Sequence, residues 1–143
     1  LCTVPLNAEC NPFVPPDADA FKNSCELARI NLAVWFAGRE VFPAFENWMF
    51  TFESGDSWQP RSPEAARAKA VELVGQAAFD AARIDPRVDN YLQTCVRIFG
   101  QTLQRGRSGI PKMIYGSYWV IPEPSDADEL IGILQKSLGV PMP

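Results

Sequence analysis

The feature that most constrains the fold of this chain is an apolar hairpin near its C-terminus. Residues 109–115 read Gly-Ile-Pro-Lys-Met-Ile-Tyr, a Gly-Ser turn follows, and residues 118–121 return as Tyr-Trp-Val-Ile. Turn residues between two apolar runs predict a β-hairpin. Because proline is disfavoured in a central strand, Pro111 favours a cis Ile110-Pro111 bond, with a trans proline at the first strand position as the alternative. The backbone of Ile110 would then be an edge to which an extended peptide can pair.

Helical patterns fill the middle of the chain. Apolar residues recur at helical spacing, and helix-start signals such as Ser-Pro at 62–63 and Asp-Pro at 85–86 precede them. The expected helices run over about residues 20–37, 43–52, 62–79, 84–105 and 125–137. Ser125 and Asp128 are expected to cap the last helix, and residues 1–4 are strand-like. The predicted order is strand, helices, hairpin and helix, in a single domain over residues 1–143.

The composition excludes several classes of function. A net charge of −4 argues against nucleic acid as a partner, since phosphates require clustered Lys and Arg. The chain has no histidine, which excludes Ser-His-Asp and Cys-His catalysis and removes the commonest zinc ligand. No apolar run of about 18 residues is present, so no membrane-spanning segment is expected in the chain. We therefore expect neither a metal nor a cofactor.

Four cysteines, at positions 2, 10, 25 and 95, permit three full pairings. Cys10 and Cys25 flank a Pro-rich loop and form the favoured disulfide, while two buried thiols are the alternative. On the chain-entropy model a bridge across a loop of this size stabilises the fold by about 3 kcal/mol. Such a bridge implies an oxidising compartment. Cys95, on the apolar face of an expected helix, is interpreted as a core residue, and a Cys2–Cys95 pair stays open.

Three regions of the chain, taken together, resemble the DsbA-like branch of the thioredoxin superfamily. Residues 5–12 and then Cys-Glu-Leu-Ala-Arg at 25–29 resemble the stretch after the third strand in a bacterial subgroup with an extra disulfide. Residues 36–50 resemble the family's helix pair, although Glu-Asn stands where that pair often carries His-Asp. Residues 84–95, followed by Gly-Ile-Pro at 109–111, resemble the family's ending, with Ile where Thr or Val often precedes the proline.

This resemblance implies an α/β fold, a thioredoxin-like sheet with a DsbA-type helical insertion over about residues 20–105. The family's Cys-x-x-Cys helix would precede Leu1, so the chain is expected to be N-terminally truncated and inactive alone. The parent protein would be a thiol-disulfide oxidoreductase acting on protein or peptide thiols and disulfides. It would act outside the cytoplasm, in the periplasm or secreted, on its own or within a larger or membrane-anchored protein. Ile110 and Pro111 would bind the substrate.

Two other interpretations stay open. The chain is a redox-inactive, thioredoxin-like module that binds a peptide or protein if no Cys-x-x-Cys lies upstream. Alternatively it is a helical scaffold in which Gly-Ile-Pro is a coincidence. An exposed strand edge would also permit dimerisation. The sequence determines neither the substrate, the redox direction nor the oligomeric state.

Overall fold

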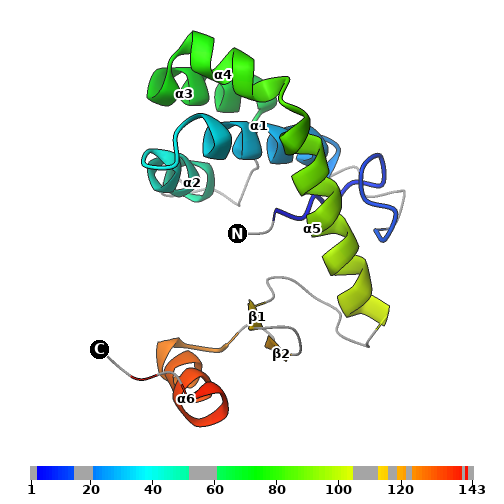
Figure 1. The fold of residues 1–143 in the computed structure, drawn as a ribbon, viewed down its shortest axis with the longest axis vertical. Helices are drawn as coiled ribbons and strands as arrows, with labels where there is room; N and C mark the ends of the chain where they lie inside the picture. Colours follow the sequence, from blue (N-terminus) through cyan, green and yellow to red (C-terminus); the bar gives the residue numbers. More distant parts are fainter. Residues whose placement is uncertain are drawn as a thin grey trace. The chain divides into compact units, whose positions relative to one another are not determined.

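The computed structural model describes residues 3–14, 21–51, 61–104, 113–115, 119–121, 124–139 and 141. The chain divides into two compact units, which we call unit 1 (Leu1–Gly100) and unit 2 (Gln101–Pro143). The helices of unit 1 are α1 (Ser24–Ala37), α2 (Phe42–Phe50), α3 (Pro63–Val74), α4 (Gln76–Arg83) and α5 (Pro86–Gln104), whose last turn enters unit 2 (Figure 1). Unit 2 also contains β1 (Met113–Tyr115), β2 (Trp119–Ile121) and α6 (Ala127–Leu138).

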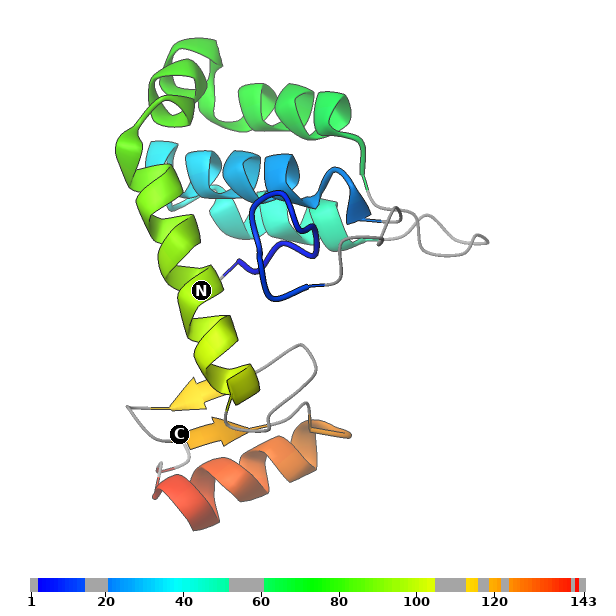
Figure 2. The ribbon, with the colours of Figure 1, turned by 90° about the vertical axis from the view of Figure 1, so that its right-hand side faces the viewer.

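Helix α1 is the centre of unit 1. It lies between α2 on one side and α3 and α4 on the other (Figure 2). Five consecutive residues of α1, from Ile30 to Val34, are buried, so the helix is covered around its whole circumference in this stretch. A helix that is apolar on most sides is stable only when neighbouring helices surround it. The sequence of α1 therefore requires the helical layers that enclose it.

The main core of unit 1 joins α1 to α2, α3 and α4. Its buried members are Ile30, Ala33, Val34, Phe42, Phe45, Ala66, Ala70, Phe79 and Ala82. The small residues of α3 and α4 allow these helices to approach α1 closely, while the aromatic side chains of α2 and α4 fill the space between them. A second, smaller cluster joins α1 to α5. It contains Ala28, Leu32, Val88 and Leu92, with Phe36 packed against it.

Local signals explain where the helices begin and end. The Ser62 Oγ accepts a hydrogen bond from the Ala65 amide at 3.2 Å, and a proline follows it at the first helical position of α3. The expected helix over 62–79 is interrupted at Gly75, whose φ of 82° is a conformation that favours glycine. Because α3 ends and α4 begins at this position, the single helix expected over 62–79 is two helices in the structure.

The N-terminus of α6 differs from the prediction. Asp126, rather than Ser125, is the N-cap, and its side chain accepts a hydrogen bond from the Glu129 amide at 2.8 Å. Ser125 lies one position earlier, and its amide and hydroxyl both donate to Glu129 Oε2 at 2.7 Å. These reciprocal bonds satisfy amides that the first turn of a helix leaves without intrahelical partners.

The predicted α/β fold, a thioredoxin-like sheet with a DsbA-type insertion, is wrong. In the part of the chain that the structure describes, the only sheet is an antiparallel pair of three-residue strands, with Ile114 opposite Val120. A thioredoxin-like α/β sheet would require further strands joined by crossover connections. Thr3 and Val4, within the strand-like N-terminal stretch, belong to no strand. Unit 1 is instead a small helical domain.

Candidate functional site

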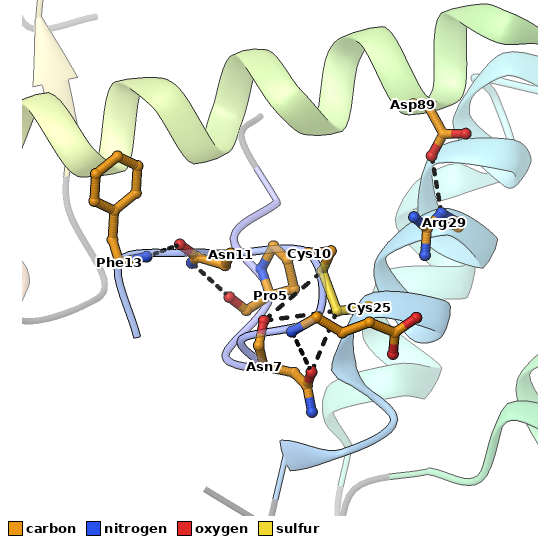
Figure 3. Close-up of a disulfide and its surroundings, with 9 residues drawn as sticks. Pro5, Asn7, Cys10, Asn11, Phe13, Cys25, Arg29 and Asp89 are labelled. Atoms are coloured by element: carbon orange, nitrogen blue, oxygen red, sulfur yellow. Dashed lines mark hydrogen bonds and ion pairs between the residues drawn. A yellow bond between two sulfur atoms is a disulfide. The ribbon is translucent and has the colours of Figure 1, made fainter. Parts of the chain in front are cut away.

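A disulfide between Cys10 and Cys25 joins the segment of residues 3–14, here called the N-terminal loop, to the first turn of α1 (Figure 3). The S–S distance is 2.09 Å, and the two cysteines are 15 positions apart. The cysteines are the pair that flanks the Pro-rich loop in the sequence. Cys95, interpreted from the sequence as a core residue, is buried in α5, and Cys2 lies outside the described residues. The disulfide therefore anchors a segment that has no helix or strand of its own.

Two asparagines organise the N-terminal loop. The fully buried Asn11 side chain donates from Nδ2 to the Pro5 carbonyl at 2.8 Å and accepts at Oδ1 from the Phe13 amide at 3.1 Å. The Asn7 carbonyl accepts from the amides of Cys10, at 3.3 Å, and Asn11, at 3.0 Å. Because asparagine offers the backbone partners within a few residues, it favours turns over strands. These bonds explain why the loop folds as successive turns.

The aromatic ring of Phe13 lies directly on the backbone of α5 at Gly100. A Cβ atom at Gly100 would overlap the ring of Phe13, and Figure 3 shows this side chain pointing toward the helix. Gly100 is buried, whereas Phe13 remains 41% exposed. The N-terminal loop thus contacts α1 through its disulfide and α5 through one aromatic ring.

A hydrogen bond joins the loop to α1 beside Glu46 of α2. Buried Asn31 donates from Nδ2 to Thr3 Oγ1 at 3.3 Å, and its side chain is close enough to Glu46 to affect the pKa of that carboxyl. Burial raises the pKa of the Glu46 carboxyl above its ordinary value, and the Asn31 side chain opposes this rise. The raised pKa means that the folded protein binds the Glu46 proton more tightly than the unfolded chain does.

Glu46→Gln is therefore expected to stabilise the protein at pH 7. A raised folded-state pKa contributes stability that is complete below the unfolded value and is lost as the pH rises through the folded value. Glutamine is neutral at every pH, so the gain should shrink as the pH falls from the raised folded-state value toward the ordinary glutamate value, and it should vanish below the ordinary value. Urea unfolding of the wild type and of Glu46→Gln, at pH 7 and at lower pH, measures the difference in their free energies of unfolding. The exposed Glu40→Gln is the control for loss of one charge, and an equal gain in both variants would contradict the assignment.

An open hollow of about 610 Å³ lies between α3 and α4. The residues that line it are Arg67, Ala68, Val71, Gln76, Phe79, Asp80 and Arg83. Two of its polar groups are engaged within the protein, since Arg67 forms an ion pair with Glu26 and Asp80 accepts a hydrogen bond from Gln76 at 2.8 Å. The hollow is therefore partly lined by apolar side chains, but it lacks the converging polar groups that orient a small ligand.

An ordered aromatic and basic surface lies where α1 meets the start of α5. The Arg87 guanidinium stacks 4.8 Å from the centre of the Phe36 ring, and Phe36 meets Tyr91 edge to face at 6.2 Å. Ile84, at the end of α4, is 76% exposed and lies three positions before Arg87. We call Phe36, Ile84, Arg87 and Tyr91 the Tyr91 cluster. Sequence reasoning missed it because its members come from different helices.

The predicted substrate-binding residues, Ile110 and Pro111, lie outside the described residues. Among the residues that the structure does describe, no group of three His, Cys, Asp or Glu side chains is arranged to hold a metal ion. Within the same residues, no helix is long and apolar enough to cross a membrane.

Comparison of the chain with family models, curated proteins and solved structures found no match. The identification of the chain as a DsbA-like member of the thioredoxin superfamily was wrong, because no family model supports it and the described fold lacks the thioredoxin-like sheet. Among the described residues, the segments that carried the resemblance are turns, helix starts and amphipathic stretches. Such segments report local structure, which unrelated helical domains share.

Proposed function

We propose that unit 1 is a non-catalytic protein-binding domain and that the Tyr91 cluster is its contact surface. The observation that carries this proposal is the exposure of a large apolar side chain, Ile84, three positions before Arg87, whose guanidinium is ordered on Phe36. Tyrosine and arginine are enriched among residues that dominate protein–protein binding energies. The expected partner is a protein surface with an apolar recess for Ile84.

The cluster is held in place before any partner binds. Asp85 accepts two hydrogen bonds from the Arg87 guanidinium, at 2.9 Å from Nε and 2.6 Å from Nη2. The same guanidinium packs on Phe36, whose ring contacts Tyr91. A long side chain that is already ordered loses less conformational entropy on binding. This arrangement supports recognition by a preorganised surface.

Exposure of Ile84 supports the same proposal energetically. Burying an isoleucine side chain contributes about 1.5–3 kcal/mol relative to leaving it in water. A single exposed apolar residue needs no explanation by itself. Ile84, however, lies within three positions of the ordered Arg87, so one partner can cover both. Covering them together would combine apolar burial with the directed contacts of the guanidinium.

A photo-crosslinking amino acid at position 84 tests this proposal. We expect it to capture one protein from the native host extract, whereas the same group at the exposed position 77 of α4 does not. The captured protein is then purified and titrated against the intact chain by calorimetry. Ile84→Asp should weaken its binding at least tenfold, while Ala77→Asp should leave it unchanged. Equal capture at both positions, or equal affinity of both variants, would contradict the proposal.

The Cys10–Cys25 disulfide supports a location in an oxidising compartment, outside the cytoplasm. To test this, the protein is isolated from its natural source and denatured, and a thiol-reactive probe is added. The probe should label neither Cys10 nor Cys25 unless the disulfide is reduced first. Labelling of both residues would contradict this location.

Disulfide exchange by a Cys-x-x-Cys upstream of Leu1 remains an alternative proposal for the parent protein. It rests on residues outside this sequence and has no support from the fold of unit 1. A peptide map of the natural protein distinguishes the two proposals. A Cys-x-x-Cys pair before Leu1 favours exchange, and its absence leaves the binding domain.

A further inference from the structure

We propose that the N-terminal loop is a redox-sensitive clasp, which holds α5 at Gly100 only while the Cys10–Cys25 disulfide is intact. Besides the Thr3–Asn31 hydrogen bond, the loop contacts the helical domain at two anchor points that the clasp uses. One is the disulfide to α1, and the other is the ring of Phe13 against the backbone of Gly100 (Figure 3). The inference rests on these contacts and is independent of the Tyr91 cluster.

The two anchor points are connected by a short, hydrogen-bonded segment. Cys10 and Phe13 are three positions apart, and Asn11 lies between them. Asn11 is fully buried and bonds both to the Pro5 carbonyl and to the Phe13 amide. The amides of Cys10 and Asn11 share the Asn7 carbonyl. Because these bonds tie the two anchors together, displacement of Cys10 moves Phe13 as well.

The contact at Gly100 depends on the loop rather than on a deep pocket. Phe13 keeps 41% of its surface exposed, so the helix alone does not enclose its ring. Glycine inside a helix is less favourable than alanine. Gly100 nevertheless provides a place where the ring meets backbone without a Cβ between them. Because the Phe13 ring is partly exposed and the helix has no side chain at Gly100, the helix alone does not hold the ring in place. In the proposal, the disulfide holds it through the N-terminal loop.

The release step is thiol–disulfide exchange with a dithiol. A thiolate of the dithiol attacks Cys10 Sγ, because Cys10 is partly exposed whereas Cys25 is buried. A mixed disulfide forms with Cys10, and Cys25 leaves as a thiolate that takes up a proton. The second thiol of the dithiol then closes the reagent's own disulfide and releases Cys10 as a thiol. Two electrons and two protons pass from the dithiol to the cysteine pair.

Hydrogen exchange on the full chain, with and without dithiothreitol, tests the release. We expect reduction to speed exchange at least tenfold in the N-terminal loop and in the turns of α5 around Gly100. At exchange times too short for global unfolding to contribute, exchange in α3 and α4 should stay unchanged. Faster exchange in the loop alone would overturn the clasp, because α5 would then be independent of the disulfide. Uniformly faster exchange in every helix would also overturn it, because the disulfide would then hold the whole domain.

A mutational cycle tests the same coupling without a reductant. In a Phe13→Ala background, Gly100→Ala should raise the folding equilibrium constant about fivefold, as expected for alanine in a helix. In the wild-type background it should fail to do so, because the new Cβ displaces the ring. In a Cys10→Ser/Cys25→Ser background, Gly100→Ala should again raise the folding equilibrium constant about fivefold, because the ring is then no longer held at Gly100. Gly132→Ala, in α6 with open space around the new Cβ, is the control. An equal effect of Gly100→Ala in all three backgrounds would overturn the proposal.

Discussion

Phe45→Ala is expected to lower the free energy of unfolding by about 3–5 kcal/mol. Phe45 is 0% exposed and lies in the main core, where α2 packs against α1. Its ring also contacts Trp48, with the ring centres 6.1 Å apart. Truncation removes the transfer free energy of the ring and leaves a cavity among helices that relax only in part. The loss is a large fraction of the stability of a typical domain, which is about 5–15 kcal/mol.

Urea unfolding, followed by circular dichroism at 25 °C, measures this loss. Phe50→Ala is the matched control, since Phe50 belongs to the same helix and is 62% exposed. We expect the control to change the unfolding free energy by less than about 1 kcal/mol. Similar losses in the two variants would show that α2 is not packed on the core through Phe45.

Replacing Cys10 and Cys25 together by serine is expected to lower the free energy of unfolding by about 3 kcal/mol, the chain-entropy estimate for a loop of this size. The cysteines are 15 positions apart, and the bond between them restricts the unfolded chain. Serine is close in size to cysteine, so the change removes the cross-link with little change in packing volume. The wild-type protein in dithiothreitol should unfold at the same urea concentration as the serine variant.

Dithiothreitol itself supplies the control for the disulfide prediction. It should leave the unfolding of the serine variant unchanged, because that variant has no Cys10–Cys25 bond to reduce. Equal unfolding midpoints of the oxidised wild type and the variant would contradict a stabilising role. A shift of the variant in the reductant would point to an effect on another group.

Several local features could be predicted from the sequence. The starts of α3 and α5 were recognised from Ser-Pro at 62–63 and Asp-Pro at 85–86. These signals work because a cap or a first-turn proline acts on amides within one turn of the helix. The break at Gly75 was missed because the helical spacing of apolar residues continues past it. A glycine inside such a pattern is ambiguous until its φ is known.

The class of fold was predicted incorrectly for a physical reason. Apolar runs at both ends of the chain are compatible with strands, yet a strand forms a sheet only with partners that supply hydrogen bonds. In the N-terminal loop, side chains such as Asn11 provide those hydrogen bonds instead. The described hairpin pairs only with itself. No pattern within a few residues distinguishes these outcomes.

The candidate sites show the same limit. The sequence placed Cys10 and Cys25 together because a loop rich in proline lies between them. It did not place Phe13 on Gly100, nor Phe36 beside Tyr91, because these residues are far apart in the chain. Contacts of this kind depend on how α1, α5 and the N-terminal loop pack, and packing is decided by the whole core.

By itself, the sequence determined the helical middle of the chain, the helix starts, the acidic net charge and the absence of histidine chemistry. These properties follow from composition or from interactions between residues within a turn of one another. Only the tertiary structure decided that unit 1 is a helical domain, that Glu46 is partly desolvated and that Phe13 reaches α5. The reason is that burial and exposure depend on neighbours brought together from distant parts of the chain.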